Sequence, residues 1–161
     1  MKIKVNDSIP EVNIYILKDG DPKVQNIKET LGNSRILLFG LPGAYTSTCS
    51  KLHLPGYVKY AEKLKAKGID KIFCISVNDP HVMNAWGEAN HVEKKITMLA
   101  DPYLSFTKSI GAEIDRNSKG MGIRSCRYAM IVENLKVVNI QVEKETKSCG
   151  ISSAEQILKI I

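Results

Sequence analysis

The sequence has no long apolar run, and this absence excludes two classes of protein. No stretch reaches the roughly 18 consecutive apolar residues that a membrane-spanning helix needs. The first residues, Met1–Asp7, also lack the apolar segment of a secretory signal. We therefore expect no membrane partner and a place in the cytoplasm, unless a longer precursor carried an organelle transit peptide that was removed.

The sequence also lacks a Cys-x-x-Cys pair, and its four cysteines stand far apart, at positions 49, 74, 126 and 149. Disulfide-stabilised secreted domains are usually shorter and richer in cysteine, and a metal site needs Cys and His residues in clusters. We therefore expect four free thiols, no metal and no bound cofactor. A glutaredoxin-like thiol–disulfide oxidoreductase remains an alternative, although such enzymes normally use the missing pair.

Aromatic residues and basic blocks are scarce as well. Aromatics make up 6% of the chain, and the lysines are interleaved with acids although the formal net charge is +6. Nucleic-acid-binding surfaces concentrate basic residues on one face and often add aromatic platforms. We therefore expect no nucleic-acid partner, and we keep a basic binding module or chaperone as the non-enzymatic alternative.

Length and hydrophobic periodicity predict a single α/β domain. A chain of 161 residues suits one domain, 1–161, with a sizeable core. The predicted strands cover residues 12–14, 36–39, 72–77, 97–100, 127–132 and 137–142, and the predicted helices cover 57–64, 80–86, 102–111 and 152–161. This order predicts a mixed sheet with helices on both faces, and the thioredoxin-like architecture is one such layout.

One segment concentrates features of a reactive thiol. Cys49 follows the predicted strand 36–39 and a Pro-Gly turn, so it is expected in or near the first turn of a helix. Unpaired N–H groups and the helix dipole favour a thiolate there. No Asp or Glu occurs from Thr30 to Ala61. Thr46 lies three residues before Cys49, which predicts that its hydroxyl lies alongside the sulfur.

Other interpretations of this segment are weaker. Cys49 and His53 have the i, i+4 spacing of a Cys–His pair on one helix face, but Pro55 is expected to limit that helix. Gly120-Met121-Gly122 follows a predicted loop and not a strand, so it is a poor phosphate-binding fingerprint. Among the remaining cysteines, Cys74 is expected in the core, and Cys149 is expected to be exposed in a mobile loop.

The residues Pro42-x-x-x-Thr46-x-x-Cys49 match the active-site motif of peroxiredoxins. The run from Leu41 to Ser50, the segment from His53 to Tyr57 and the pair Arg124-x-x-Arg127 resemble the type-5, or plant type II, subfamily. The resemblance covers essentially the whole chain. Ser47 departs from it, since many members have a second proline there.

The resemblance implies a thioredoxin-like fold with N-terminal β extension and a thiol-dependent peroxidase that acts on hydrogen peroxide and alkyl hydroperoxides in antioxidant defence. It implies that Cys49 is the peroxidatic cysteine and becomes a sulfenic acid. The resemblance implies further site residues: Thr46 as the hydroxyl partner of the sulfur, Pro42 as its shield from water, Arg127 as the arginine beside the thiolate, and Thr48 and Gly43 as substrate-binding residues.

The resemblance leaves recycling open. Members of the subfamily resolve the sulfenic acid with a second cysteine or pass it to glutathione and glutaredoxin, so thioredoxin and glutaredoxin/glutathione are both candidate reductants. Cys149 and Cys74 are the candidate resolving cysteines, and Cys126 is a third possibility. Many members are dimers, which implies a homodimer here.

Overall fold

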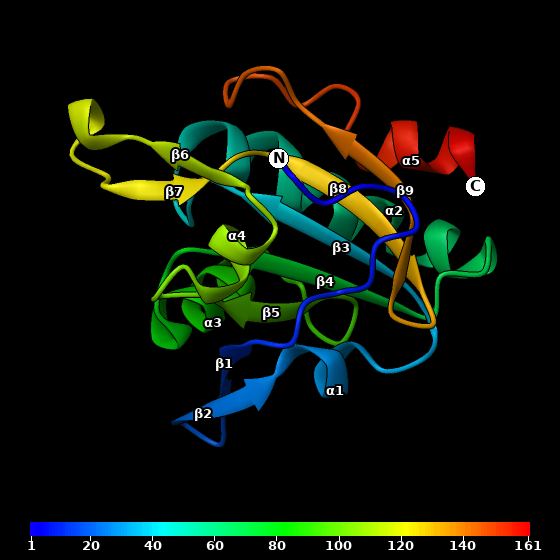
Figure 1. Cartoon of the computed structure of the whole chain (residues 1–161), viewed down its shortest axis with the longest axis horizontal. Helices are drawn as coiled ribbons and strands as arrows, with labels where there is room; N and C mark the ends of the chain where they lie inside the picture. Colours follow the sequence, from blue (N-terminus) through cyan, green and yellow to red (C-terminus); the bar gives the residue numbers. More distant parts are fainter.

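A computed structural model describes all residues, 1–161, and places a seven-stranded mixed sheet at the centre of the molecule (Figure 1). The strand order is β2-β1-β5-β4-β3-β8-β9, in which β3, β4 and β5 run parallel to one another and the other neighbours pair antiparallel. The strands are β1 (Asn13–Lys18), β2 (Asp21–Asn26), β3 (Arg35–Leu41), β4 (Lys71–Ser76), β5 (Thr97–Ala100), β8 (Tyr128–Glu133) and β9 (Lys136–Val142).

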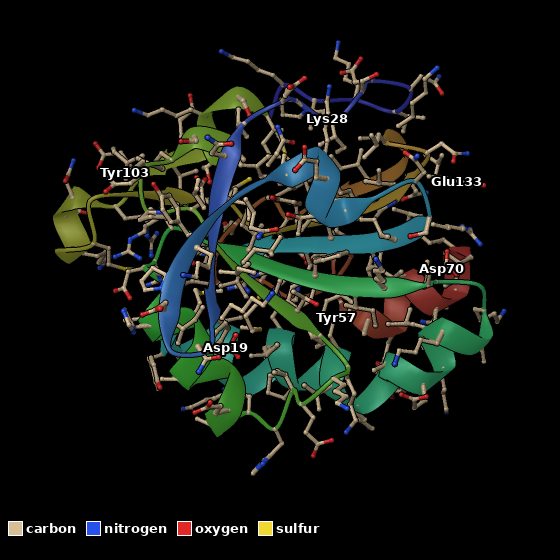
Figure 2. The ribbon with its side chains drawn as sticks, turned by 90° about the horizontal axis from the view of Figure 1, so that it is seen from below. Asp19, Lys28, Tyr57, Asp70, Tyr103 and Glu133 are labelled. Atoms are coloured by element: carbon tan, nitrogen blue, oxygen red, sulfur yellow. The ribbon has the colours of Figure 1, made fainter.

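Helices cover both faces of this sheet. One apolar cluster packs α2 (Leu54–Ala66), α3 (Pro80–Ala89) and α5 (Ala154–Ile160) on one face, and a second packs α1 (Ile27–Leu31) and α4 (Ser105–Ser109) on the other. Figure 2 shows these two layers, with Lys28 of α1 on one side and Tyr57 of α2 on the other. No helix is both long and apolar enough to cross a membrane.

The central strands are continuous apolar runs because both of their faces are buried. In β3, Leu37 and Phe39 belong to the cluster under α2, whereas Ile36 and Leu38 belong to the cluster under α1 and α4. The carboxyl ends of β3, β4 and β5 lie at one edge of the sheet, because these strands are parallel. The loop that carries Cys49 leaves the sheet at this edge.

The structure confirms the predicted mixed sheet and adds elements that the sequence pattern missed. The missed elements are β2, α1 and a small ribbon, in which β6 (Glu113–Asp115) pairs with β7 (Ile123–Ser125). These two short strands flank the loop expected at 115–122, which contains a 3-10 turn, η2 (Asn117–Lys119). Figure 1 shows the ribbon projecting from one end of the sheet. Strand β2 contains Pro22 and few apolar residues because it is an exposed edge strand.

The expectation that Pro55 limits the helix after Cys49 was wrong. A π-helical turn, η1 (Cys49–His53), leads directly into α2, in which Pro55 is one of the first residues. The Leu54 N–H donates to the Cys49 carbonyl, five residues back. The N–H that Pro55 lacks therefore falls where five-residue spacing changes to the four-residue spacing of an α-helix, so the path continues to Ala66.

Candidate active site

Strand register brings Cys49 and Arg127 together although they are far apart in sequence. Cys49 begins the π turn after β3, and Arg127 immediately precedes β8. Strands β3 and β8 pair antiparallel with Gly40 opposite Tyr128, so Arg127 lies beside the point where the Cys49 loop leaves the sheet. Both side chains are buried, at 0% and 1% exposure.

The Arg127 guanidinium contacts the sulfur directly. Its Nη2 lies 3.3 Å from Cys49 Sγ and donates to the Thr146 carbonyl at 2.9 Å. Its Nη1 lies 3.0 Å from His53 Nδ1. A permanently charged donor at this distance stabilises a thiolate more than a neutral thiol. The pair therefore provides a nucleophilic sulfur with a fixed cation beside it.

His53 does not form the Cys–His pair that its spacing suggested. Arg127 occupies His53 Nδ1, and His53 Nε2 lies 3.1 Å from the carbonyl of Ser152. A carbonyl can only accept, so Nε2 carries the proton and Nδ1 accepts from Arg127. Burial, and then the charge of Arg127, lower the pKa of His53 from 6.5 to about 3. The ring is therefore a neutral acceptor that orients the guanidinium.

The segment on both sides of Cys49 is held by side chains from neighbouring elements. Asn78 Oδ1 accepts from the Ala44 N–H at 3.0 Å, and Trp86 Nε1 donates to Ser50 Oγ at 3.0 Å. Thr46 Oγ1 donates to the Gly43 carbonyl at 2.8 Å, so its lone pairs stay free to accept a proton donor. The hydroxyl proton of Thr46 is directed to the Gly43 carbonyl and not to the Cys49 sulfur.

A pocket of about 150 Å³ lies over this arrangement. Pro42, Thr46, Thr48 and Arg127, which the sequence singled out, line it together; Gly43 does not line it and contributes its carbonyl to Thr46. The other lining residues, which the sequence did not single out, are Ser47, Arg116, Met121, Thr146 and Lys147. No sequence signal could have found the distant ones, because they lie in irregular segments 67 residues or more beyond Cys49.

The segment 143–152 closes the site from the carboxyl-terminal side. Glu143 Oε1 accepts from Gly150 N at 2.6 Å and from Ser152 N and Ser152 Oγ at 2.9 Å each. Cys149 is half-buried in this segment, and burial raises its pKa to about 11. The expectation of an exposed Cys149 was therefore wrong, and one carboxylate holds both backbone and side-chain donors of its loop.

The remaining cysteines occupy different places. Cys74 is fully buried in β4, where burial, and then the charge of Cys49, raise its pKa well above the usual value. It belongs to the apolar cluster that contains Cys49, whereas Cys126 packs against the cluster on the opposite face of the sheet. The sheet therefore separates Cys126 from Cys49. No three His, Cys, Asp or Glu side chains come together to hold a metal ion.

Comparisons with known proteins agree with this geometry. The family model described as Redoxin matches residues 4–158. A rice protein named Peroxiredoxin-2C is 42% identical over 161 residues, which cover 99% of this chain and 98% of the relative. An Arabidopsis thaliana protein named Peroxiredoxin-2D is also 42% identical, over 160 residues that cover the same shares of the two chains.

A solved structure gives the same result. The structure of reduced Prx3 from Vibrio vulnificus in complex with H₂O₂ aligns with a TM-score of 0.92 at 44% identity, covering 98% of each chain. The glutaredoxin-like and non-enzymatic alternatives find no support in these relatives. The chain therefore belongs to the redoxin family and, within it, to the type II peroxiredoxins, which reduce peroxides with a cysteine thiol.

Proposed function

We propose that Cys49 is the peroxidatic residue of this thiol peroxidase. The observation that carries the proposal is the 3.3 Å contact between Arg127 Nη2 and Cys49 Sγ. The thiolate attacks one peroxide oxygen, the S–O bond forms and the O–O bond breaks, and the leaving oxygen takes a proton to give water or an alcohol. Cys49 then carries a sulfenic acid. Arg127 stabilises the thiolate and the negative charge that develops on the leaving oxygen.

The pocket residues have complementary roles in the proposal. Because the Thr46 hydroxyl donates to the Gly43 carbonyl, its oxygen can accept the peroxide O–H and align the O–O bond with the sulfur. Pro42 covers the site and brings no N–H group to it. The Thr48 hydroxyl donates to the Lys147 carbonyl at 3.4 Å and so ties the pocket to the carboxyl-terminal segment.

Substitution of the sulfur tests the proposal. Cys49→Ser is expected to reduce the rate of hydrogen peroxide consumption to the level without enzyme, because a serine hydroxyl at neutral pH is a far weaker nucleophile. The matched control is Cys126→Ser, which removes a thiol on the opposite face of the sheet and leaves turnover unchanged. Wild-type turnover by a folded Cys49→Ser protein would contradict the assignment.

For recycling, we propose Cys149 as the resolving cysteine. Its thiol attacks the Cys49 sulfenic sulfur, a disulfide forms and water leaves. The proposal is supported by the position of Cys149 in the segment whose carbonyls contact Arg127 and Thr48, and by its partial exposure. Cys74 is held in a central strand and has less freedom to move. Peptide mapping after one equivalent of peroxide identifies the pair, and a Cys49–Cys74 disulfide would overturn the choice.

The disulfide then needs an external reductant, for which we propose thioredoxin or glutaredoxin with glutathione. Such a cycle requires a supply of reduced thiols and therefore a reducing compartment such as the cytoplasm. Peroxide consumption measured in parallel with each of the two reductant systems identifies the physiological class of reductant. If peroxide is consumed neither with the thioredoxin system nor with the glutaredoxin/glutathione system, this part of the proposal is contradicted.

We further propose a homodimer through the edge of the sheet at which β3 and β5 end. Tyr45 and Tyr103 follow these strands and are 60% and 73% exposed, and Figure 2 shows Tyr103 at the surface. Tyr45 has a φ of 60°, a costly conformation for a bulky residue and one typical of functional positions. Sedimentation analysis is expected to give a dimer for the wild type and a monomer for Tyr103→Glu. A monomeric wild type would contradict the proposal.

A further inference from the structure

The entrance of the peroxide pocket carries two cations that the proposed reaction does not use. Arg116 follows β6 on the projecting ribbon, and Lys147 belongs to the segment that closes the site. Both line the 150 Å³ pocket together with Arg127. No Asp or Glu lines this pocket, so Arg116 and Lys147 add two positive charges to it beyond that of Arg127, which faces the Cys49 sulfur.

Neither cation has a partner in the structure. The side chains of Arg116 and Lys147 take part in none of the five ion pairs, which all lie elsewhere on the molecule, and they make no hydrogen bond. Arg116 Nε is shielded from solvent and also lacks an acceptor. The neighbouring Asp115 accepts from the Asn117 N–H at 2.7 Å and so stabilises its own turn.

The carboxylates nearest to the two cations lie outside the pocket. Asp115 and Glu145 line a second, more open hollow, which Arg116 and Lys147 also line. The side that faces Thr46 and Arg127 therefore presents positive charge with no carboxylate in the lining of the pocket. A partly enclosed cationic pocket attracts anions, and the fork of an arginine matches the two oxygens of a carboxylate.

We propose that Arg116 and Lys147 form an anion subsite at the pocket entrance, which favours small hydroperoxides that carry a carboxylate. The proposal rests on the peroxidase function of Cys49 and names a substrate class for the same pocket. Met121 is the only large apolar side chain other than Pro42 in the lining, so the pocket offers little apolar surface to a long acyl chain. The subsite takes no part in bond making. The thiolate still cleaves the O–O bond, and the product is the alcohol of the same carboxylate.

A matched pair of substrates tests the subsite. The charged probe is tert-butyl hydroperoxide in which one methyl group bears a carboxylate, 3-hydroperoxy-3-methylbutanoate, and the neutral probe is its methyl ester. Trp86, the only tryptophan, is hydrogen-bonded to Ser50 beside Cys49, so its fluorescence in a stopped-flow instrument reports oxidation of Cys49 without any reductant. The rate constant for oxidation of Cys49 is measured with each probe. The readout is the rate constant for the carboxylate divided by the rate constant for the ester.

Arg116→Gln and Lys147→Gln are each expected to lower this ratio about fivefold, since each removes one partly screened charge. The ratio in the wild type is also expected to fall as ionic strength rises. The control Lys119→Gln removes a charge from the same ribbon but outside the pocket, and it leaves the ratio unchanged.

An unchanged ratio in Arg116→Gln and Lys147→Gln, or an equal fall of both rate constants, would overturn the subsite. Failure of the proposed function would look different. In that case hydrogen peroxide itself would produce no Cys49-dependent fluorescence change in the wild type.

Discussion

At the scale of single residues, His53 and the Thr146 carbonyl together orient the guanidinium of Arg127. Its Nδ1 accepts from the guanidinium at 3.0 Å, while its Nε2 is held by the Ser152 carbonyl. Two amide substitutions separate these contacts. Asparagine places its oxygen near the position of Nδ1, whereas glutamine places its amide near the position of Nε2. His53→Asn therefore keeps an acceptor for Arg127, and His53→Gln keeps a donor for Ser152.

We expect His53→Gln to lower kcat/KM for hydrogen peroxide about tenfold or more, because a hydrogen bond to a charged group is lost and the guanidinium turns away from the sulfur. His53→Asn is expected to retain most of the activity. Thermal unfolding serves as the check that both proteins are folded. Equal losses in the two variants would show that His53 acts only in packing.

The buried His53 also makes stability depend on pH. The pKa of its ring falls from 6.5 when unfolded to about 3 in the folded protein, so only the unfolded chain takes up this proton in between. The contribution of the neutral, buried His53 ring to the free energy of unfolding is complete above pH 6.5 and is lost as pH falls toward 3. The loss amounts to about 2 kcal/mol between pH 6.5 and 5. Urea unfolding at pH 6.5 and 5 is expected to show a smaller change in the free energy of unfolding for His53→Asn than for the wild type. An equal change in the two proteins would contradict the assignment.

At the scale of elements, hydrogen bonds to Glu143 hold the segment 143–152 over the site. We call this set of hydrogen bonds the latch. One oxygen of Glu143 holds three donors from Gly150 and Ser152, on either side of the exposed Ile151, and Cys149 lies next to them. Release of this latch would free Cys149 to approach Cys49. The burial that raises the pKa of Cys149 to about 11 would also be relieved, and the thiolate would become more populated.

Glu143→Gln is therefore expected to accelerate formation of the Cys49–Cys149 disulfide severalfold after one equivalent of peroxide, because an amide accepts these hydrogen bonds more weakly than a carboxylate. Quenched-flow alkylation with peptide mapping measures the rate. Glu145→Gln is the matched control, since Glu145 lies in the same segment and its carboxylate accepts no hydrogen bond from the loop. A slower disulfide in Glu143→Gln would show that the loop must be held in place for resolution.

At the scale of the whole molecule, hydrophobic patterning predicts the strands that are buried in the core and misses the strands that lie at the surface. The strands β3, β4 and β8 are apolar on both faces, so their sequence identifies them. The exposed strand β2 and the β6–β7 ribbon carry little periodicity, so they were missed.

The site divides in the same way. The segment from Pro42 to Cys49 is local, so its sequence alone indicated a reactive thiol. The partner of His53 could not be found by helix spacing, because Arg127 reaches it from another strand across 74 residues. Arg116 and Lys147 meet the pocket only through the folding of two irregular segments.

The buried guanidinium of Arg127 has no carboxylate partner, so in the proposed reaction the Cys49 thiolate is the anion that balances it. Turnover removes that negative charge, because a sulfenic acid is neutral. A buried charge left without its counterion destabilises a protein by about 3–5 kcal/mol. In the proposed reaction, oxidation of Cys49 is therefore expected to lower the free energy of unfolding of the enzyme. Reduction of Cys49 is therefore expected to restore both the nucleophile and the stability of the protein.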